Sequence, residues 1–278
     1  GGNPRPVTAD DMGYVLSTPV VPEFLTAREF LQFFLEINRD RIPYPKAPDV
    51  YLDYMCIDEA DRGKLLKDFS HGMKNKMQML VNIMADPTVL LLDEPFSALD
   101  SYLKWNLEIE LADLLATFNG PILWVSHDRD ECYRNCRSVC VMENGRTGEV
   151  TPMDEMIRHP GSVSAARLAG CKNFFAAEAK DGKVYLPEWN VALPLVVTEK
   201  PFTTLGILDN AVTLSESGGM SCTVCRMIPG VEENILLLRP EGSAEGAPML
   251  RIAVGHESDL QAGAAVRVAL DYSKLLLL

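Results

Sequence analysis

Residues 90–95 read Leu-Leu-Leu-Asp-Glu-Pro, a short apolar run that ends in two carboxylates. A continuous apolar run is typical of a strand that is buried on both faces of a parallel sheet. The carboxyl ends of such strands are where α/β folds bind their ligands. Asp93 is therefore a candidate Mg²⁺ ligand, and Glu94 is a candidate to face an attacking water. Taken alone, the pair is equally explained as two acids that end a strand.

A second apolar run, Ile122–Val125, ends in Ser126-His127-Asp128. Residues 102–118 lie between the two runs and have the apolar spacing of an amphipathic crossover helix, so the runs are predicted to be neighbouring parallel strands. Asp93 and His127 should then emerge on the same edge of the sheet. A histidine there can donate a hydrogen bond to a terminal phosphate, although a lone strand-end histidine is more often structural.

Upstream, residues 69–73 read Phe-Ser-His-Gly-Met and open a segment with helical spacing that Pro87 closes. Ser70 as the cap and Gly72 in the first turn leave backbone N–H groups and the positive end of the helix dipole available to a phosphate. A plain N-cap explains Ser70 equally well. Farther upstream, Thr26 is predicted to cap a helix over residues 27–37.

In this order and at these intervals, the three motifs resemble those of the ATP-binding-cassette (ABC) ATPase family: its signature motif, Walker B motif with D-loop, and switch histidine. The resemblance covers residues from about 12 to 165, and the stretch LLLDEPFSALD at 90–100 is highly specific for it. It implies these roles: Ser70 and Gly72 touch ATP held by a partner subunit, Asp93 holds magnesium, Glu94 is the general base, Asp100 is the D-loop acid and His127 senses the γ-phosphate.

The same resemblance implies the cofactors and the partners. ATP and Mg²⁺ would be bound, and the subunit would work with transmembrane permease subunits and a second nucleotide-binding subunit in a homodimer. Its place would be the cytoplasmic face of the cell membrane, as a peripheral protein. A nucleic-acid partner is not expected, because the net charge of −13 offers no basic face to phosphates.

Three departures from the family pattern stand out. The signature reads FSHGM rather than the commoner LSGGQ, and Ser17 stands where a Gln or Glu normally reaches the metal and water. No GxxxxGK(S/T) occurs in the sequence, since Gly63-Lys64 and Gly182-Lys183 lack both the partner glycine and the following Ser or Thr. We expect the phosphate-binding loop, with its strand and helix, to lie ahead of residue 1, and an exposed apolar seam where that segment packs.

The two parts of the chain resemble different branches of the family. Residues 13–30 and 69–74 are similar to ATPases of antibiotic and peptide exporters, whereas residues 96–105, 165–173 and 238–241 are similar to molybdate and sulfate importer ATPases. The importer match is longer and favours an oxyanion importer. The alternatives are an exporter ATPase, a catalytically dead fragment, or a regulatory oxyanion-binding protein. A true fusion, a recombinant chain and a misassembled reading frame all remain open.

From about residue 174, short β-like segments are punctuated by Gly, Pro, Asp and Asn. We therefore predict an α/β fold in two domains. Residues 1–165 would form an incomplete P-loop NTPase sheet, and residues 166–278 a small antiparallel, OB-like β-barrel of the transport-associated oligomer-binding type. A generic β domain without a ligand is the alternative for the second domain.

The seven cysteines do not have the spacing of a zinc site, because no histidine lies near them at ligand distance. Cys132, Cys136 and Cys140 are four apart, which suits one stripe of a helix. Cys222 and Cys225 form a CxxC, but the Thr and Val between them favour a strand. Reduced thiols are therefore predicted in preference to a metal or redox role, and the cytosol is the compartment that fits.

Overall fold

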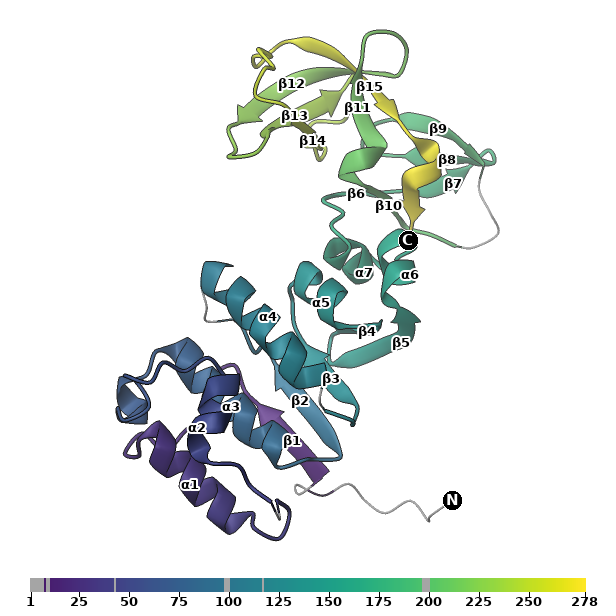
Figure 1. The fold of residues 1–278 in the computed structure, drawn as a ribbon. Helices are drawn as coiled ribbons and strands as arrows, with labels where there is room; N and C mark the ends of the chain where they lie inside the picture. The colour runs from purple at the N-terminus through teal and green to yellow at the C-terminus, as the bar shows by residue number, and fades with distance from the viewer. Residues whose placement is uncertain (1–7, 9–10, 43, 98–100, 117, 197–200) are drawn as a thin grey trace. The chain divides into compact units, whose positions relative to one another are not determined.

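The computed structural model describes residue 8 and residues 11–42, 44–97, 101–116, 118–196 and 201–278 (Figure 1). Contacts between residues divide the chain into two compact units, Gly1–Cys136 and Arg137–Leu278. These units and the domains predicted from the sequence are different divisions, so the domain boundary at 165/166 stays a prediction. Among the described helices, none is both long and apolar enough to cross a membrane.

The first unit is built on a three-stranded parallel sheet in the order β1-β2-β3. The strands are β1 (Met12–Val15), β2 (Val89–Asp93) and β3 (Ile122–Val125). Leu91 lies opposite Tyr14 on one side and Leu123 on the other, and Asp93 lies opposite Val125. The predicted parallel pairing of the two apolar runs is confirmed.

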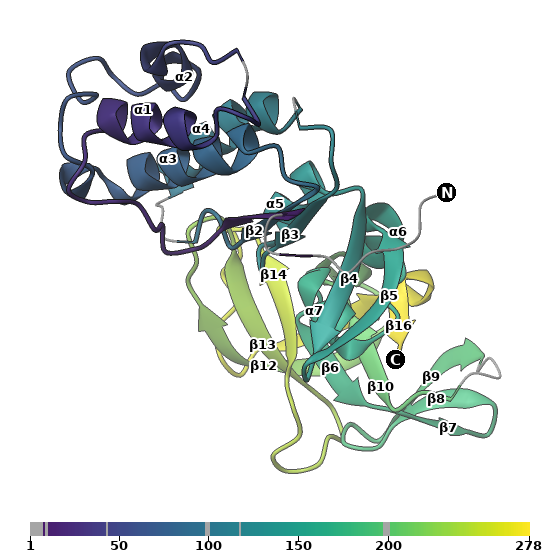
Figure 2. The ribbon, with the colours of Figure 1, turned by 90° about the horizontal axis from the view of Figure 1, so that it is seen from below.

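Helices cover one face of this sheet, as Figure 2 shows for α1, α3 and α4. The helical elements of the unit are α1 (Ala27–Ile37), α2 (Pro48–Tyr54), the 3₁₀ turn η2 (Leu66–Asp68), α3 (His71–Met84), α4 (Ser101–Ala116) and α5 (Arg129–Asn135). Helix α1 begins as predicted, because Thr26 and Glu29 form a reciprocal capping box. The covered face of the sheet is apolar and fully buried at Leu90 and Leu92.

The opposite face of the sheet carries exposed apolar side chains. Tyr14 is 41% exposed, Leu123 is 56% exposed and Val125 is 41% exposed, although parallel sheets are normally covered on both faces. The exposed apolar side chains that we expect from the sequence are therefore present, while the segment that would pack on them stays a prediction. β3 is also an edge of the sheet, so its outer backbone groups do not pair with another strand of the described sheet.

The second unit begins with a hairpin and two short helices. β4 (Ser138–Glu143) pairs antiparallel with β5 (Arg146–Pro152), and α6 (Met153–Arg158) and α7 (Val163–Leu168) follow. Asn144 and Gly145 form the turn with φ angles of 51° and 73°. Positive φ at both positions is what a two-residue hairpin turn needs, and Asn-Gly provides it at little cost. The structure therefore has the hairpin that an Asn-Gly dipeptide indicates in a sequence.

The rest of the second unit is antiparallel, in three sheets ordered β16-β10-β6, β7-β8-β9 and β11-β15-β12-β13-β14. The strands are β6 (Asn173–Ala176), β7 (Glu178–Lys180), β8 (Lys183–Leu186), β9 (Val191–Val196), β10 (Thr204–Ile207), β11 (Val212–Ser215), β12 (Met220–Ile228), β13 (Asn234–Pro240), β14 (Leu250–Val254), β15 (Ala265–Leu270) and β16 (Leu275–Leu277). The 3₁₀ turns η3 (Asp209–Ala211) and η4 (Tyr272–Lys274) connect some of them. In the described residues β11 and β14 are the outer strands of the largest sheet and do not pair with each other. The antiparallel prediction is confirmed, but the closed barrel is not.

Candidate functional site

The carboxyl ends of β2 and β3 bring Glu94 and His127 into direct contact. Glu94 follows β2 with a φ of 48°, and its backbone N–H donates to the carbonyl of Val125 at 2.8 Å. The chain therefore turns sharply at Glu94 as it leaves β2, and the Glu94 side chain extends along the edge of the sheet toward the end of β3. The His127 Nδ1 and the Glu94 Oε1 lie 2.7 Å apart. Two residues separated by 33 positions are thus joined where the sequence places the reactive edge.

The contact favours the charged form of the histidine. The hydrogen bond to Glu94, together with the charge of that carboxylate, raises the pKa of His127, while slight burial works in the opposite direction. The His127 side chain is 77% exposed and that of Glu94 is 30% exposed, so both groups are accessible to a ligand. A protonated imidazole can donate to a phosphate oxygen, and a carboxylate can accept a proton from water.

A hollow of about 220 Å³ opens at this edge. It is lined by Glu94, Phe96, Ser97, Lys104, Ser126, His127, Asp128 and Glu131. One cation, two nearby carboxylates and the Glu94–His127 pair therefore share a small polar space. Lys104, Asp128 and Glu131 were not among the predicted site residues.

Asp93 ends β2 one residue before Glu94 and is half-buried, and it is not one of the residues that line the hollow. Mg²⁺ is commonly held by one or two carboxylates together with substrate phosphates and water, rather than by a full set of protein ligands. No cluster of three or more potential ligands occurs among the described residues. One strand-end carboxylate therefore fits Mg²⁺ that arrives with a nucleotide, and does not fit a metal held by the protein alone.

Ser70 and Gly72 do not line this hollow. The Ser70 hydroxyl accepts a hydrogen bond from the backbone N–H of Met73 at 3.2 Å and caps α3. The N-cap role of Ser70 is therefore confirmed, and its contact with a nucleotide stays a prediction. Next to it, His71 Nε2 lies 3.1 Å from the carbonyl of Ser17, which ties the start of α3 to the segment after β1. Asp100 lies outside the described residues.

Helix α3 also contacts the chain just beyond Glu94. The fully buried Asn75 donates from Nδ2 to the carbonyl of Pro95 at 3.0 Å. This bond spans 20 residues and links the helix that begins at Ser70 to the turn that follows β2. The sequence offered no signal for it beyond the presence of an amide on the apolar side of a helix.

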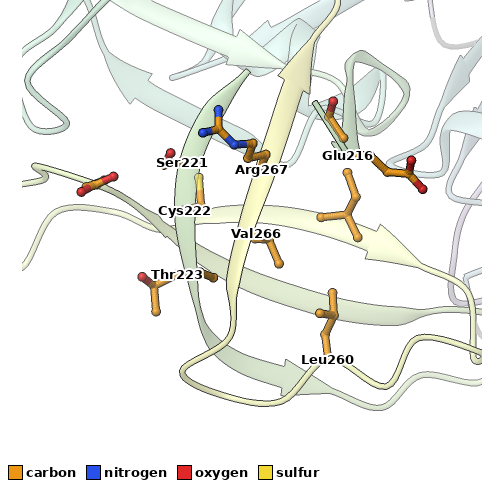
Figure 3. Close-up of a pocket in the computed structure, with 11 residues that line it drawn as sticks. Glu216, Ser221, Cys222, Thr223, Leu260, Val266 and Arg267 are labelled. Atoms are coloured by element: carbon orange, nitrogen blue, oxygen red, sulfur yellow. The ribbon is translucent and has the colours of Figure 1, made fainter. Parts of the chain in front are cut away.

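A hollow of about 670 Å³ in the second unit lies on the five-stranded sheet (Figure 3). Arg267 of β15 is opposite Ser215 of β11 on one side and Ser221 of β12 on the other. Glu216 and Glu241 also line it. Two carboxylates beside one guanidinium do not make a site selective for an anion.

The cysteines fall into different environments, and one prediction about them is wrong. Cys132 lies in α5, Cys136 follows the end of that helix and Cys140 lies in β4, so they do not share one helical stripe. The helix ends because Cys136 is extended, with ψ of 136°. Cys222 and Cys225 lie in β12, which confirms the strand predicted for the CxxC. All seven thiols are free.

We expect the thiols to react in two classes. Cys56 and Cys140 are exposed, whereas Cys171 and Cys222 are buried. Burial raises the pKa of Cys222 to about 11 and also raises that of Cys171, which further lowers the thiolate fraction at neutral pH. Alkylation by iodoacetamide followed by mass spectrometry should modify the exposed pair in the native protein and the buried pair only after unfolding. Rapid native labelling of Cys222 would contradict this assignment.

No protein-family model matches the chain, but comparison with known proteins gives relatives that are described as import ATP-binding proteins. The chain is 28% identical over 164 residues to the Fe(3+) ions import ATP-binding protein FbpC of Photorhabdus laumondii, covering 58% of this chain and 47% of that protein. It is 25% identical over 280 residues to the sulfate/thiosulfate import ATP-binding protein CysA 2 of Agrobacterium fabrum, covering 97% and 79%. The chain spans about half the length of the first of these relatives.

A solved structure described as the ATP binding subunit of an ABC transporter aligns with a TM-score of 0.43 and 26% identity, covering 57% of this chain and 67% of that one. The sequence relatives include iron, polyamine and sulfate importers. In sequence, this chain is therefore similar to the ATP-binding subunits of ABC importers.

Proposed function

We propose that this chain forms part of the ATP-hydrolysing, energy-coupling subunit of an ABC importer. The single observation that carries the proposal is the contact between Glu94 and His127 at the carboxyl ends of two neighbouring parallel strands. The sequence similarity to import ATP-binding proteins supports it independently.

In this proposal each side chain at the edge has one task. Glu94 orients the attacking water and takes its proton, and protonated His127 donates a hydrogen bond to the terminal phosphate. Asp93 would hold Mg²⁺, which when bound neutralises charge on the phosphates. Because the Glu94 carboxylate raises the pKa of His127, the imidazole keeps its proton at a pH where an ordinary histidine loses part of it.

The phosphates themselves need a further binding element. The sequence contains no GxxxxGK(S/T), and such a loop normally supplies a nest of backbone N–H groups and a lysine. We infer that a strand–loop–helix segment outside these 278 residues supplies it. The unpaired edge of β3 and the exposed Leu123 and Val125 support addition of that strand beside β3.

The assembly would be a pair of such subunits bound to transmembrane permease subunits at the cytoplasmic face of the membrane. Ser70 and Gly72 of each subunit, with Asp100, would contact ATP held by the other. An oxyanion of the sulfate or molybdate type is the cargo that we favour, because the sulfate/thiosulfate relative covers 97% of the chain. The second domain would then be a transport-associated domain.

A catalytically dead or regulatory protein is the second candidate, favoured by the absence of the GxxxxGK(S/T) motif. An exporter ATPase is the third, favoured by the form of residues 69–74. The identity of the permease encoded beside this chain separates import from export.

Calorimetry with Mg-ATP tests where the nucleotide is held. We expect the 278-residue chain to bind ATP weakly, with a Kd above roughly 1 mM, and the chain joined to a strand–GxxxxGK(S/T)–helix segment of a relative to bind far more tightly. Tight binding by the 278-residue chain that is lost in Asp93→Asn would show that the phosphates need no added segment.

A further inference from the structure

Lys104 links helix α4 to the start of helix α5 at the candidate site. It lies on α4, its side chain is 19% exposed, and its Nζ lies 2.6 Å from Asp128 Oδ2 and 2.7 Å from Glu131 Oε2. Partial burial works against its charged form, but the hydrogen bonds to both carboxylates outweigh that effect and raise the pKa of Lys104. Lys104 is therefore positively charged at neutral pH, and its two ion pairs hold α4 against the start of α5.

The two carboxylates that Lys104 binds are themselves anchored. Glu131 is 3% exposed and accepts a hydrogen bond from the indole of Trp124 on β3 at 2.6 Å. Asp128 caps α5, because its Oδ1 accepts the N–H groups of Asp130 at 2.9 Å and Glu131 at 3.0 Å. The bond from Lys104, with the backbone bonds, lowers the pKa of Asp128 to about 2. Asp128 therefore remains charged at neutral pH.

His127 directly precedes Asp128, but little of the protein packs around its own ring. It stands between Ser126 and Asp128, whose backbone N–H is bound by the Ser126 hydroxyl at 3.1 Å. Its ring is 77% exposed, and within the described part of the chain Glu94 is its one hydrogen-bond partner. The orientation of the imidazole is thus set by the turn from β3 to α5 rather than by packing around the ring.

We propose that Lys104 is a positioning residue that, by holding Asp128 and Glu131 together, fixes this turn so that His127 meets Glu94. The inference rests on the proposed function only in giving the Glu94–His127 contact a catalytic purpose. The contact itself can be measured without nucleotide. The positioning role of Lys104 can therefore fail while the proposed ATPase function stands, and the proposed ATPase function can fail while the positioning role stands.

The test is an NMR titration of the four histidines, with His127 assigned by its loss in His127→Asn. Glu94 acts on this ring through the hydrogen bond and through its charge, and Asp128 and Glu131 act through their charges. In Lys104→Met we expect the pKa of His127 to fall toward that of an ordinary histidine, because the contact with Glu94 is lost. Removing a cation without moving the turn would instead raise the pKa, since Asp128 and Glu131 would then act unopposed.

The control variants distinguish a change in the position of the turn from a change in charge and from a failure to fold. Lys104→Arg should keep the wild-type titration, and Glu94→Gln should lower the pKa of His127 in the same direction as Lys104→Met. Combined with Glu94→Gln, Lys104→Met should give no further fall. If Lys104→Met does not fold, it is measured with Glu131→Gln, which removes the buried charge but keeps an acceptor for Trp124. An unchanged or raised pKa of His127 in the folded Lys104 variant overturns the proposal.

Discussion

Glu94→Gln, placed in the chain joined to a phosphate-binding segment and assembled with its permease, should lower ATP hydrolysis by roughly 10²–10⁴-fold, the usual worth of a positioned general base. The amide keeps the size of Glu94 and an oxygen that can accept from His127, but it cannot take a proton from water. ATP binding should persist, because the phosphate-binding loop and the metal contacts are unchanged. Phosphate release and nucleotide binding, measured on the same preparation, give the two quantities.

The matched control is Glu59→Gln, since Glu59 is an exposed glutamate of the same unit that lies outside the hollow around Glu94. That variant should hydrolyse ATP at the wild-type rate. Hydrolysis that survives in Glu94→Gln, or that falls equally in both variants, would remove Glu94 from the role of general base.

Ser70→Arg should prevent two subunits from closing around ATP. In the Glu94→Gln background, hydrolysis is blocked and the closed dimer should accumulate with Mg-ATP. Arg at position 70 brings bulk and charge to the exposed start of α3, where Ser70 and Gly72 are proposed to meet the nucleotide of the partner. Sedimentation velocity should therefore show a dimer for Glu94→Gln and a monomer for the Ser70→Arg, Glu94→Gln double variant.

Ser70→Ala provides the matched control, because it removes the cap on the Met73 N–H without adding bulk. Loss of the cap should cost about 1 kcal/mol of stability in both variants. If Ala and Arg at this position both leave the dimer intact, Ser70 is a helix cap only, and the signature-motif reading of residues 69–73 is withdrawn.

The reactive edge of the sheet could be predicted because its signals are local. An apolar run followed by acids at 93 and 94, and a second run followed by His127, are sufficient to place these side chains at neighbouring strand ends. The Thr26 capping box and the Asn144-Gly145 turn were predictable for the same reason, since each depends on residues within a few positions of one another.

The support around His127 could not be predicted, because it depends on distant side chains. Lys104 and Asp128 are 24 positions apart. The sequence of a helix does not show which of its polar residues will contact the turn at the end of a strand. Glu131 reads as an ordinary helix-face acid, yet it is buried and bound by Trp124. Both assignments need the crossing of α4, β3 and α5 in three dimensions.

The closed barrel that we predict from the sequence is not confirmed, because strand patterns alone do not decide closure. Alternating apolar residues define strands and their faces, but closure depends on which edge strands meet. In the described second unit a register shift between Val224 and Arg226 of β12 interrupts the ladder with β13. Such a bulge bends one strand relative to its neighbour, and the CxxC in which it lies gives no sign of it.

The most direct test of the central claim is steady-state ATP hydrolysis by two matched proteins: the 278-residue chain, and the same chain preceded by a strand–GxxxxGK(S/T)–helix segment. If the edge formed by Asp93, Glu94 and His127 is the hydrolytic half of an ABC ATPase site, the first protein is inactive. The second should then hydrolyse Mg-ATP and lose that activity when Glu94 is replaced by Gln. Equal hydrolysis by both proteins, or an extended protein that folds and binds ATP but has activity independent of Glu94 and His127, would contradict the account.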